Sequence, residues 1–468
     1  MTSTDVKGAE SAGDPTANEA VGHAAGAAPV AAGSALEDVD TTAAPELEEE
    51  NLSLPGQPAS AAHAALNRGA RKRSFEVSEH EVPKSDVEEW RFTPLRRFTA
   101  LFQDEPTDDR AGDPAVDYQV EVPEGAAEPS TLAPGQAPRG TVLVPEDLPT
   151  AVASARTEQA LHLVAAKNVA YDAPFRIEMT GRGADRRGNA HIVLEAQESS
   201  SATFVLNHTG AAQYAQNVEM IIGDNAQMTV ITLHDWDDDA VHIATHHARV
   251  GRDSRLKHVA VTLGGSAVRL NSIGEYAAPG GEIEKLGLYF SDENQFFENR
   301  LFVDHSAPNC TSNVAYKGAL QGKNARSVWV GDVLIRKEAE GTDTYELNRN
   351  LVLTDGARAD SVPNLEIETG EIEGAGHASA TGRFDDEQLF YLRSRGIPEA
   401  AARRLVVRGF FAEMITKIGV ASVEERLLAA IDAELDTVLG HLTGAYDENE
   451  DEQAVIDAIE AAEPGASK

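Results

Sequence analysis

Histidines are the residues of this chain whose types and spacing most readily suggest chemistry. Five of them fall within one stretch rich in β-forming residues: His234, His242, His246, His247 and His258. His242 and His246 are an even number of residues apart, so they would share one face of a strand. Clustered imidazoles can hold a divalent metal ion. Because the pattern fixes no carboxylate at ligand spacing, we interpret them as solvated or hydrogen-bonded strand histidines. A metal site formed by His234, His242 and His246 stays an open alternative.

Two other groups could act as catalysts. The acidic run "DWDDDAVH", from Asp235 to His242, could hold an acid/base pair or calcium, but it lacks the alternating spacing and the glycine of an EF-hand. We interpret it as a charged turn. The chain's one cysteine, Cys310, has no partner base marked in the sequence and is interpreted as a small buried hydrophobe. A single cysteine also excludes an internal disulfide framework and a self-sufficient thiolate cage.

His377 differs from the other histidines in its neighbours. It lies in "GAGHASATGRFDDEQLFYLRSRGI", which begins at Gly374, and every residue from Gly374 to Gly382 apart from the histidine is small. Small residues let another backbone or a ligand approach closely. On chemistry alone, an ordinary turn histidine is the preferred interpretation.

Composition limits the classes of partner. The 468 residues carry a formal net charge of −37, which disfavours binding to nucleic acid and to anionic membrane surfaces. The chain has no run of about 18 apolar residues, so we expect no membrane insertion. Its acidic, alanine-rich N-terminus does not read as a secretory signal, and we expect a cytoplasmic protein. No phosphate loop, nucleophile elbow or dinucleotide fingerprint is present.

The elements that position these residues follow a clear order along the chain. Residues 1–75 form an acidic, alanine-rich segment expected to be disordered, and 76–140 a helical or loop region. Residues 141–383 hold short strands such as "ATFVLNH", "MTVITLH" and "KLGLYFS", separated by Gly, Asn and Asp. Residues 384–445 have helical patterns with caps, and 446–468 form an acidic tail.

A turn-plus-strand unit recurs within the strand region. Its copies are "GDNAQMTVITL" from Gly223, "GRDSRLKHVAV" from Gly251 and "GKNARSVWVGDVLI" from Gly322. Recurring units of this kind bury their faces against their neighbours, which predicts stacked coils. We therefore expect a mostly-β fold, an irregular right-handed parallel β-helix (a β-solenoid) followed by a C-terminal α-helical domain. A jelly roll or a β-sandwich stays an alternative because turns and strands alone do not fix topology.

Three segments resemble the SufB/SufD family, the scaffold subunits of the SUF iron–sulfur cluster assembly system. They are "NVAYKGALQGKNARSVWVGDVLI", "VPNLEIETGEIEGAGHASATGRFDDEQLFYLRSRGI" and the helices that follow, within a similarity covering roughly residues 85–440. The resemblance is closer to SufD. SufB-type chains have a "HEAT" motif where this one reads "HASAT" from His377, and a functional cysteine upstream, whereas residues 351–376 contain none.

The resemblance implies a β-helix core, a C-terminal helical domain and a complex of one SufB-like paralogue, one SufD and two copies of the SufC-like ABC ATPase. It places a functional histidine at His377, at the SufB interface. There the nascent iron–sulfur cluster would be bound transiently and shared with the partner, whose cysteine supplies thiolate. His377 is therefore a candidate ligand of iron or cluster, and no cofactor is expected to bind tightly to this chain alone.

The helical end would dock the ATPase, and ATP hydrolysis would belong to that partner, so we expect a non-catalytic subunit. The apolar residues expected to take part are Phe390, Tyr391, Leu392, Ile397, Phe410 and Phe411. Two alternatives belong to other classes. One is a β-helix carbohydrate-active enzyme that uses carboxylates from Asp235 to Asp239. The other is a metal oxygenase in which His242 and His246 converge with a carboxylate.

Overall fold

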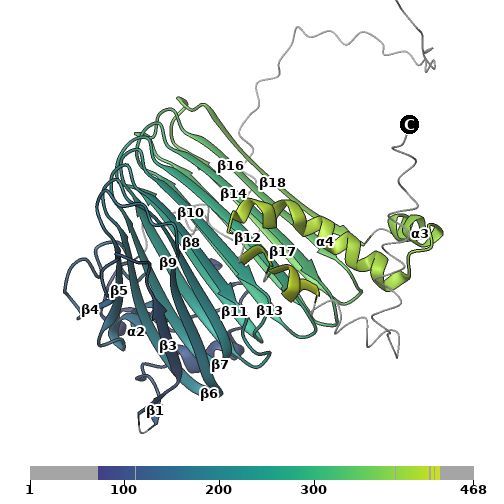
Figure 1. The fold of residues 1–468 in the computed structure, drawn as a ribbon, viewed down its shortest axis with the longest axis horizontal. Coiled ribbons are helices and arrows are strands. Elements are labelled where there is room, and N and C mark those ends of the chain that lie inside the picture. The colour runs from purple at the N-terminus through teal and green to yellow at the C-terminus, as the bar shows by residue number, and fades with distance from the viewer. Residues whose placement is uncertain (1–71, 111, 385, 421–422, 426, 433–468) are drawn as a thin grey trace, which may run out of the picture. The chain divides into compact units, whose positions relative to one another are not determined.

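The computed structural model describes residues 72–432, apart from 111, 385, 421–422 and 426. The N-terminal segment predicted to be disordered lies outside the described residues up to residue 71, and so does the whole acidic tail 446–468. The described residues form a parallel β-solenoid of about eight turns, followed by a few helices (Figure 1). Parallel pairing between successive coils confirms the β-helix prediction rather than the jelly roll or sandwich.

Two faces make up the solenoid, and each full coil contributes one strand to each face. One face has the strands β8 (Gln227–His234), β10 (Arg255–Thr262), β12 (Glu282–Ser291), β14 (Thr311–Leu320), β16 (Asp343–Val352) and β18 (Gly374–Arg383). The other has β9 (Val241–Val250), β11 (Ala267–Tyr276), β13 (Phe296–His305), β15 (Arg326–Ile335) and β17 (Arg358–Ile367). The two long strands β6 (Phe175–Ala196) and β7 (Ser201–Ile222) come before them, and β7 pairs with both β8 and β9. The faces therefore meet at β7 and grow coil by coil toward β17 and β18.

The recurring turn found in the sequence forms a ladder at the corners of the coils. Asn225, Asp253 and Asn324 have φ angles of +55°, +49° and +64°, a left-handed conformation that Asn and Asp tolerate well. The N–H of each donates to a carbonyl in the turn of the next coil, at Arg252, Pro279 and Gly356 respectively. The repeated motif thus satisfies backbone groups that would otherwise be left unpaired at the corners.

Alternation along each strand separates an interior from an outer surface. The interior holds the largest apolar cluster, which includes Phe175, Phe204, Val230 and Trp329. The outer surfaces are also covered over much of their length, which explains why strands such as β13 are buried at every residue. β17 and β18 differ, because most of their residues are only partly buried or are exposed.

The N-terminal elements cover the outer surface of the β9–β15 face. They are the 3₁₀ helices η2 (Val77–Glu79), η3 (Glu88–Trp90) and η4 (Leu95–Phe102) and the helix α2 (Leu148–Ala155). A buried charge network attaches them, because Glu89 accepts from Arg269 at 2.8 Å and lies 3.2 Å from Arg300. Removing one member of such a network leaves an uncompensated buried charge, which typically costs about 3–5 kcal/mol.

Short strands lie in the region where the sequence indicated only helices and loops. They are β1 (Asp109–Arg110), β2 (Asp113–Pro114), β3 (Val116–Glu121), β4 (Ser130–Leu132) and, just beyond it, β5 (Ala160–Ala165). β3 pairs antiparallel with β6, and β4 pairs antiparallel with β5. These strands extend the sheet at the N-terminal end of the solenoid.

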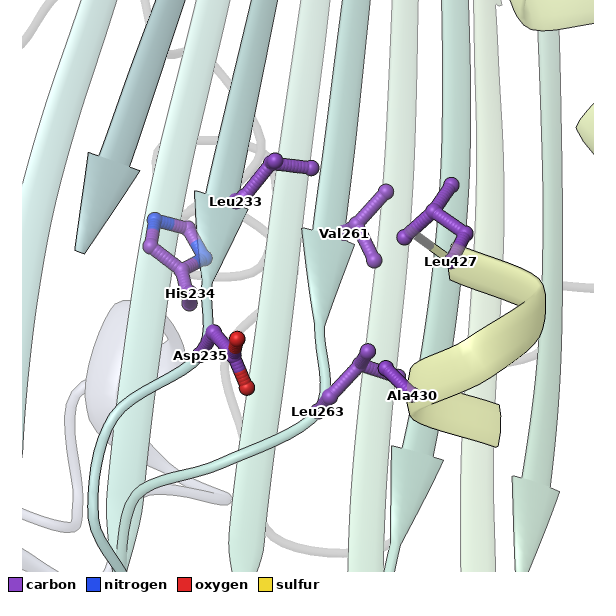
Figure 2. A pocket seen from close by; sticks show the side chains of 7 residues that line it. All are labelled: Leu233, His234, Asp235, Val261, Leu263, Leu427 and Ala430. Atoms are coloured by element: carbon purple, nitrogen blue, oxygen red, sulfur yellow. The ribbon is translucent and has the colours of Figure 1, made fainter. Parts of the chain in front are cut away.

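The longest C-terminal helix and the helical residues after it lie on the outer surface of the other face, and the helix before it contacts that longest helix. α3 (Asp386–Ser394) ends before Gly396, whose φ is +88°, and α4 (Glu399–Ile418) ends at Gly419, with φ +74°. Helical residues continue at 423–425 and 427–432. Their apolar side chains join those of β8, β10, β12 and β14 in one buried cluster. Figure 2 shows this contact, in which Leu427 and Ala430 lie against Leu233, Val261 and Leu263, leaving a cavity of only about 10 Å³. None of the helices in the described part of the chain is long and apolar enough to cross a membrane.

Candidate site at the open end of the solenoid

His377 lies on β18, the last strand of its face. Its register partner on β16 is Glu346, and in-register neighbours on parallel strands point to the same side of the sheet. Glu346 is an interior residue with 1% of its surface exposed, so His377 continues an interior row. His377 is nevertheless exposed, because no further strand pairs with β18 on its outer side among the described residues. The histidine therefore occupies an interior-type position at the open end of the solenoid.

The small residues around His377 are not all required by packing within this chain. A side chain added at Gly376 would meet the Tyr345 ring at 3.3 Å, whereas one added at Gly382 would meet nothing within 4 Å. Glycine at position 382 thus leaves room that the described residues do not fill. The edge of β18 around His377 therefore has only small side chains, and the imidazole projects beyond them.

Glu346 is unusual among the buried acids. Neither of its carboxylate oxygens has a hydrogen-bond partner within the described part of the chain. Burial and, to a smaller extent, the nearby Asp332 carboxylate raise its pKa to about 8, although Lys285 opposes this shift in part. Glu346 is therefore mostly protonated and uncharged at pH 7, because its pKa lies above that pH.

A glycine on the opposite face makes room for Glu346. A side chain at Gly331 would approach Oε1 of Glu346 to 2.9 Å and would overlap the ring of Trp329. The indole and the carboxyl group therefore share the space that Gly331 leaves open. This arrangement fixes a large aromatic ring and a buried acid in the coil directly beneath β17 and β18.

A hydrogen-bonded network lies beside Glu346 and joins Asn348 and Asn350 of the same strand to Tyr289 of β12, two strands below. The hydroxyl of Tyr289 donates to Oδ1 of Asn350 at 2.5 Å, and the Asn350 amide donates to Asn348 at 2.8 Å. The network reaches the last coil, since Ser361 donates to Asn348 at 2.6 Å and Asn350 donates to Thr381 at 3.3 Å. These bonds anchor β17 and β18 to the coil below, and each such bond typically contributes about 1 kcal/mol.

Further polar groups lie deeper in the row beneath His377. The row runs from Glu346 through Val314 and Lys285 to His258. The Lys285 ammonium is fully buried and donates to the backbone carbonyl and the hydroxyl of Ser272, at 2.9 and 2.8 Å. The interior of this solenoid therefore mixes polar and apolar positions, and Lys285 and His258 of this row hydrogen-bond Ser272 and His246 of the opposite face.

The strand histidines of the sequence analysis divide into three groups. His234 and His242 converge, but the third member of their cluster is His208 of β7 rather than His246. His246 instead hydrogen-bonds His258 at 2.9 Å. His247 faces the outer side and lies 3.5 Å from Glu275. No carboxylate belongs to the three-histidine group that the described residues form, so the two-histidine and carboxylate arrangement of a metal oxygenase is not assembled there.

The other two candidates match their simpler interpretations. Asp237, Asp238 and Asp239 lie next to one another in the exposed turn between β8 and β9. Cys310 is fully buried, and its burial raises the pKa of the thiol. Consecutive carboxylates in one turn are not the opposed pair that glycoside hydrolysis uses, and a buried, protonated thiol is a poor nucleophile.

The apolar residues expected to dock the ATPase differ widely in exposure. Phe390 and Tyr391 of α3 are 74% and 56% exposed. Leu392, Ile397 and Phe410 are partly buried. Phe411 is completely buried in the cluster between α4 and the sheet, so its side chain has no surface to offer a partner. Burial of such a side chain stabilises the fold by about 1.5–3 kcal/mol, which accounts for its presence without a docking role.

Comparison with known proteins identifies the family. The model of the SufBD core domain of the SUF iron–sulfur cluster assembly system matches residues 179–410. An iron–sulfur cluster assembly SufBD family protein of Mycobacterium bovis is 50% identical over 391 residues, which are 82% of this chain and 97% of that protein. This chain belongs to the SufBD family.

The similarity extends to proteins named SufD. The iron–sulfur cluster assembly protein SufD of Bacillus subtilis is 26% identical over 299 residues, 62% of this chain and 68% of that one. SufD of Escherichia coli is 27% identical over 250 residues, 52% and 58% of the two chains. This SufBD family chain is therefore SufD-like, as the "HASAT" segment indicated.

Two residues of these interior rows were missed by sequence reasoning. His208 ends the predicted strand "ATFVLNH", and its register partner is His234. The signal was available, because both histidines close a strand with the same alternation. Glu346 lies in "TYELNRN", where it alternates with Asn348 and Asn350 as an interior residue does, but three polar residues at that spacing resemble a solvent-facing row.

Proposed function

We propose that this chain is a non-catalytic scaffold subunit of a SufBCD-type complex, in which His377 contributes to the site where an iron–sulfur cluster is assembled. The proposal rests on one observation: His377 is exposed at the open end of the solenoid, in a chain whose one cysteine is buried. Iron–sulfur clusters are held mainly by cysteine thiolates. The thiolates would therefore come from another chain, which we propose to be a SufB-like paralogue facing β17 and β18.

The surroundings of His377 support a role toward iron or thiol. An imidazole can bind iron or accept a proton from a thiol of the partner. The acid directly beneath it in register, Glu346, is mostly uncharged at pH 7, so that position adds little negative charge below the ring. The cluster would be cargo held between two subunits rather than a resident cofactor.

The C-terminal helices would recruit a SufC-like ATPase, which would hydrolyse ATP. Phe390 and Tyr391 support this role, since large exposed apolar side chains on neighbouring positions mark interaction surfaces. Leu392, Ile397 and Phe410 are partly buried and would contribute at the margin of that surface. Phe411 is left out, because the sheet already covers it.

Co-expression with a SufB-like and a SufC-like partner tests the complex. We expect all three proteins to co-purify, and recruitment of neither partner would overturn the proposal. Phe390→Glu should lower ATPase recovery at least tenfold while the SufB-like subunit is retained, because a charge would replace an apolar contact. Val87→Glu is the matched control, since Val87 is also exposed, at 47%, but lies in the N-terminal segment. Unchanged ATPase recovery with folded Phe390→Glu would contradict the docking surface.

A further inference from the structure

Three histidines meet inside the solenoid, far from its open end. His208 of β7 and His234 of β8 are register partners, and His242 projects from β9 on the other face. The ring centroids of every pair are 5.0 Å apart, and one nitrogen from each ring lies within 4.8 Å of the other two. All three side chains have at most 1% of their surface exposed. Five strand spacings separate β8 from β18, about 24 Å, so this cluster is distinct from the site at His377.

The hydrogen bonds of two of these rings leave a nitrogen lone pair available. Nδ1 of His208 donates to the carbonyl of Leu233 at 3.0 Å, so Nε2 is the unprotonated atom in the neutral ring. Nε2 lies 3.2 Å from Oε1 of Gln216, which is an acceptor, so in this tautomer the Nε2 lone pair makes no hydrogen bond there. The two ring nitrogens of His234 hydrogen-bond hydroxyls, Nδ1 that of Thr262 at 3.1 Å and Nε2 that of Thr232 at 3.2 Å. Since a hydroxyl can donate or accept, His234 can adopt either tautomer.

His242, the third ring, differs from the other two in its hydrogen bonding. The indole N–H of Trp236 donates to Nδ1 of His242 at 3.1 Å, so in the neutral ring the proton lies on Nε2. That Nε2 is buried and has no hydrogen-bond partner among the residues that the structure describes. Buried polar atoms are nearly always paired, and an exception calls for an explanation such as a bound ion.

We propose that His208, His234 and His242 form a binding site for one divalent transition-metal ion inside the solenoid. Three imidazole ligands suit Zn²⁺, Co²⁺ or Fe²⁺, and they do not suit Mg²⁺ or Ca²⁺, which take oxygen ligands. The ligand atoms would be Nε2 of His208, Nε2 of His242 and one ring nitrogen of His234. Nitrogen atoms at 2.0–2.1 Å from Zn²⁺ lie about 3.4 Å apart in tetrahedral geometry, so the rings close by about an ångström on binding.

Binding through Nε2 of His242 requires its proton to move to Nδ1, where it would meet the Trp236 N–H. The ring stays neutral in this step, and one hydrogen bond is lost. Loss of such a bond changes an equilibrium by about tenfold, whereas structural Zn²⁺ sites bind more tightly by many orders of magnitude. The metal ion therefore binds although the Trp236 hydrogen bond is lost. Trp236 lowers the affinity for the ion but does not prevent binding.

Metal content of the full-length chain tests this proposal. We would produce it in medium supplemented with Co²⁺ or Zn²⁺, and also refold it with each ion, since the buried rings favour loading during folding. We expect about one ion per chain by elemental analysis and, with Co²⁺, the visible absorption of a four- or five-coordinate site. His208→Ala and His242→Ala should lose the ion. His305→Gln, which removes another fully buried histidine, and His377→Ala should keep it.

Trp236→Phe is the sharpest variant, because it leaves all three ligands in place. We expect it to bind Co²⁺ about tenfold more tightly than the wild type, since the competing indole donor is gone. The Co²⁺ affinity of Trp236→Phe still tests the metal site if the alanine variants do not fold. Less than a tenth of an ion per wild-type chain, equal metal in His242→Ala, or unchanged or weaker binding by Trp236→Phe would each overturn the proposal. None of these readouts depends on the proposed role of His377.

Discussion

His242 and His377 are the same chemical group at two places in one solenoid. His242 lies between coils on both sides, has no exposed surface and contacts other rings. His377 lies on the last strand of its face, where the coil below supports it and no strand of the described chain covers it. Both side chains follow the inward-pointing alternation of their strands. The difference teaches that the position of a coil in the stack decides whether an inward-pointing residue is structural or available to a partner.

Acid should affect the middle of the solenoid most. Burial lowers the pKa of His208 to about 4 and the pKa values of His258 and His305 to about 3, and it holds those of His234 and His242 well below the ordinary value. The unfolded chain takes up these protons near pH 6.5 and the folded chain does not. Folding stability is therefore present above pH 6.5 and is lost as pH falls, by up to about 3 kcal/mol per histidine at pH 4.

Urea unfolding with a chelator present, repeated from pH 7.5 to pH 5, measures this loss. We expect the free energy of unfolding to fall steeply below pH 6.5. His305→Gln should reduce the slope by about one proton, because burial lowers the pKa of His305. A flat profile would show that the interior histidines are not held neutral.

Glycine-to-alanine substitutions should also lower the folding stability much more in the interior than in the last coil. A side chain at Gly287 would overlap the ring of Tyr316, which has 1% of its surface exposed. We expect Gly287→Ala to destabilise the fold by about 3 kcal/mol, because an overpacked interior must shift. Gly382→Ala in β18 should stay within about 0.5 kcal/mol, since nothing lies within 4 Å of the added atom. Equal changes in the urea midpoint of the two variants would remove the contrast.

The boundary between the two regions can be tested at Glu346. Its pKa is raised to about 8, so the folded chain holds this proton more tightly than the unfolded chain. Wild-type stability is therefore reduced progressively as pH rises from the ordinary glutamate range through pH 8. Relative to the wild type, Glu346→Gln should gain about 3.5 kcal/mol between pH 5 and pH 8.

Glu373→Gln is the control for Glu346→Gln, because Glu373 is exposed in the turn just before β18. A gain of the same size in Glu373→Gln would show that the effect does not come from burial of the Glu346 carboxyl. A Glu346→Gln difference that is constant from pH 5 to pH 9 would mean that the buried carboxyl titrates normally.

The smallest stability effect is expected at His377. Its side chain is exposed, so His377→Ala should change the free energy of unfolding by less than about 0.5 kcal/mol. His305→Ala is the comparison variant in the interior, and we expect it to lose more stability. It removes a fully buried ring whose Nε2 hydrogen-bonds the Ser312 hydroxyl at 2.9 Å. Comparable losses in urea unfolding for the two variants would place His377 among the structural histidines.

The sequence predicted the coils better than the contacts between them. The recurring Gly–polar–polar–small turns indicated stacked coils. The turns recur because each corner needs a residue in the left-handed conformation, which Asn225 and Asp253 supply. It did not predict that His208 would join His234 and His242, because the two faces are brought together by register and not by spacing along the chain. Phe411 was expected at a docking surface, since the apolar residues of α4 do not mark which side faces the sheet.

Cluster content of the assembled complex tests the central claim most directly. We would co-express this chain, as wild type and as His377→Ala, with SufB-like and SufC-like partners under anaerobic conditions, and measure subunit stoichiometry, iron and sulfide. The account predicts that the His377→Ala complex assembles with unchanged stoichiometry and carries little iron and sulfide. A His377→Ala complex with a full complement of cluster would contradict it.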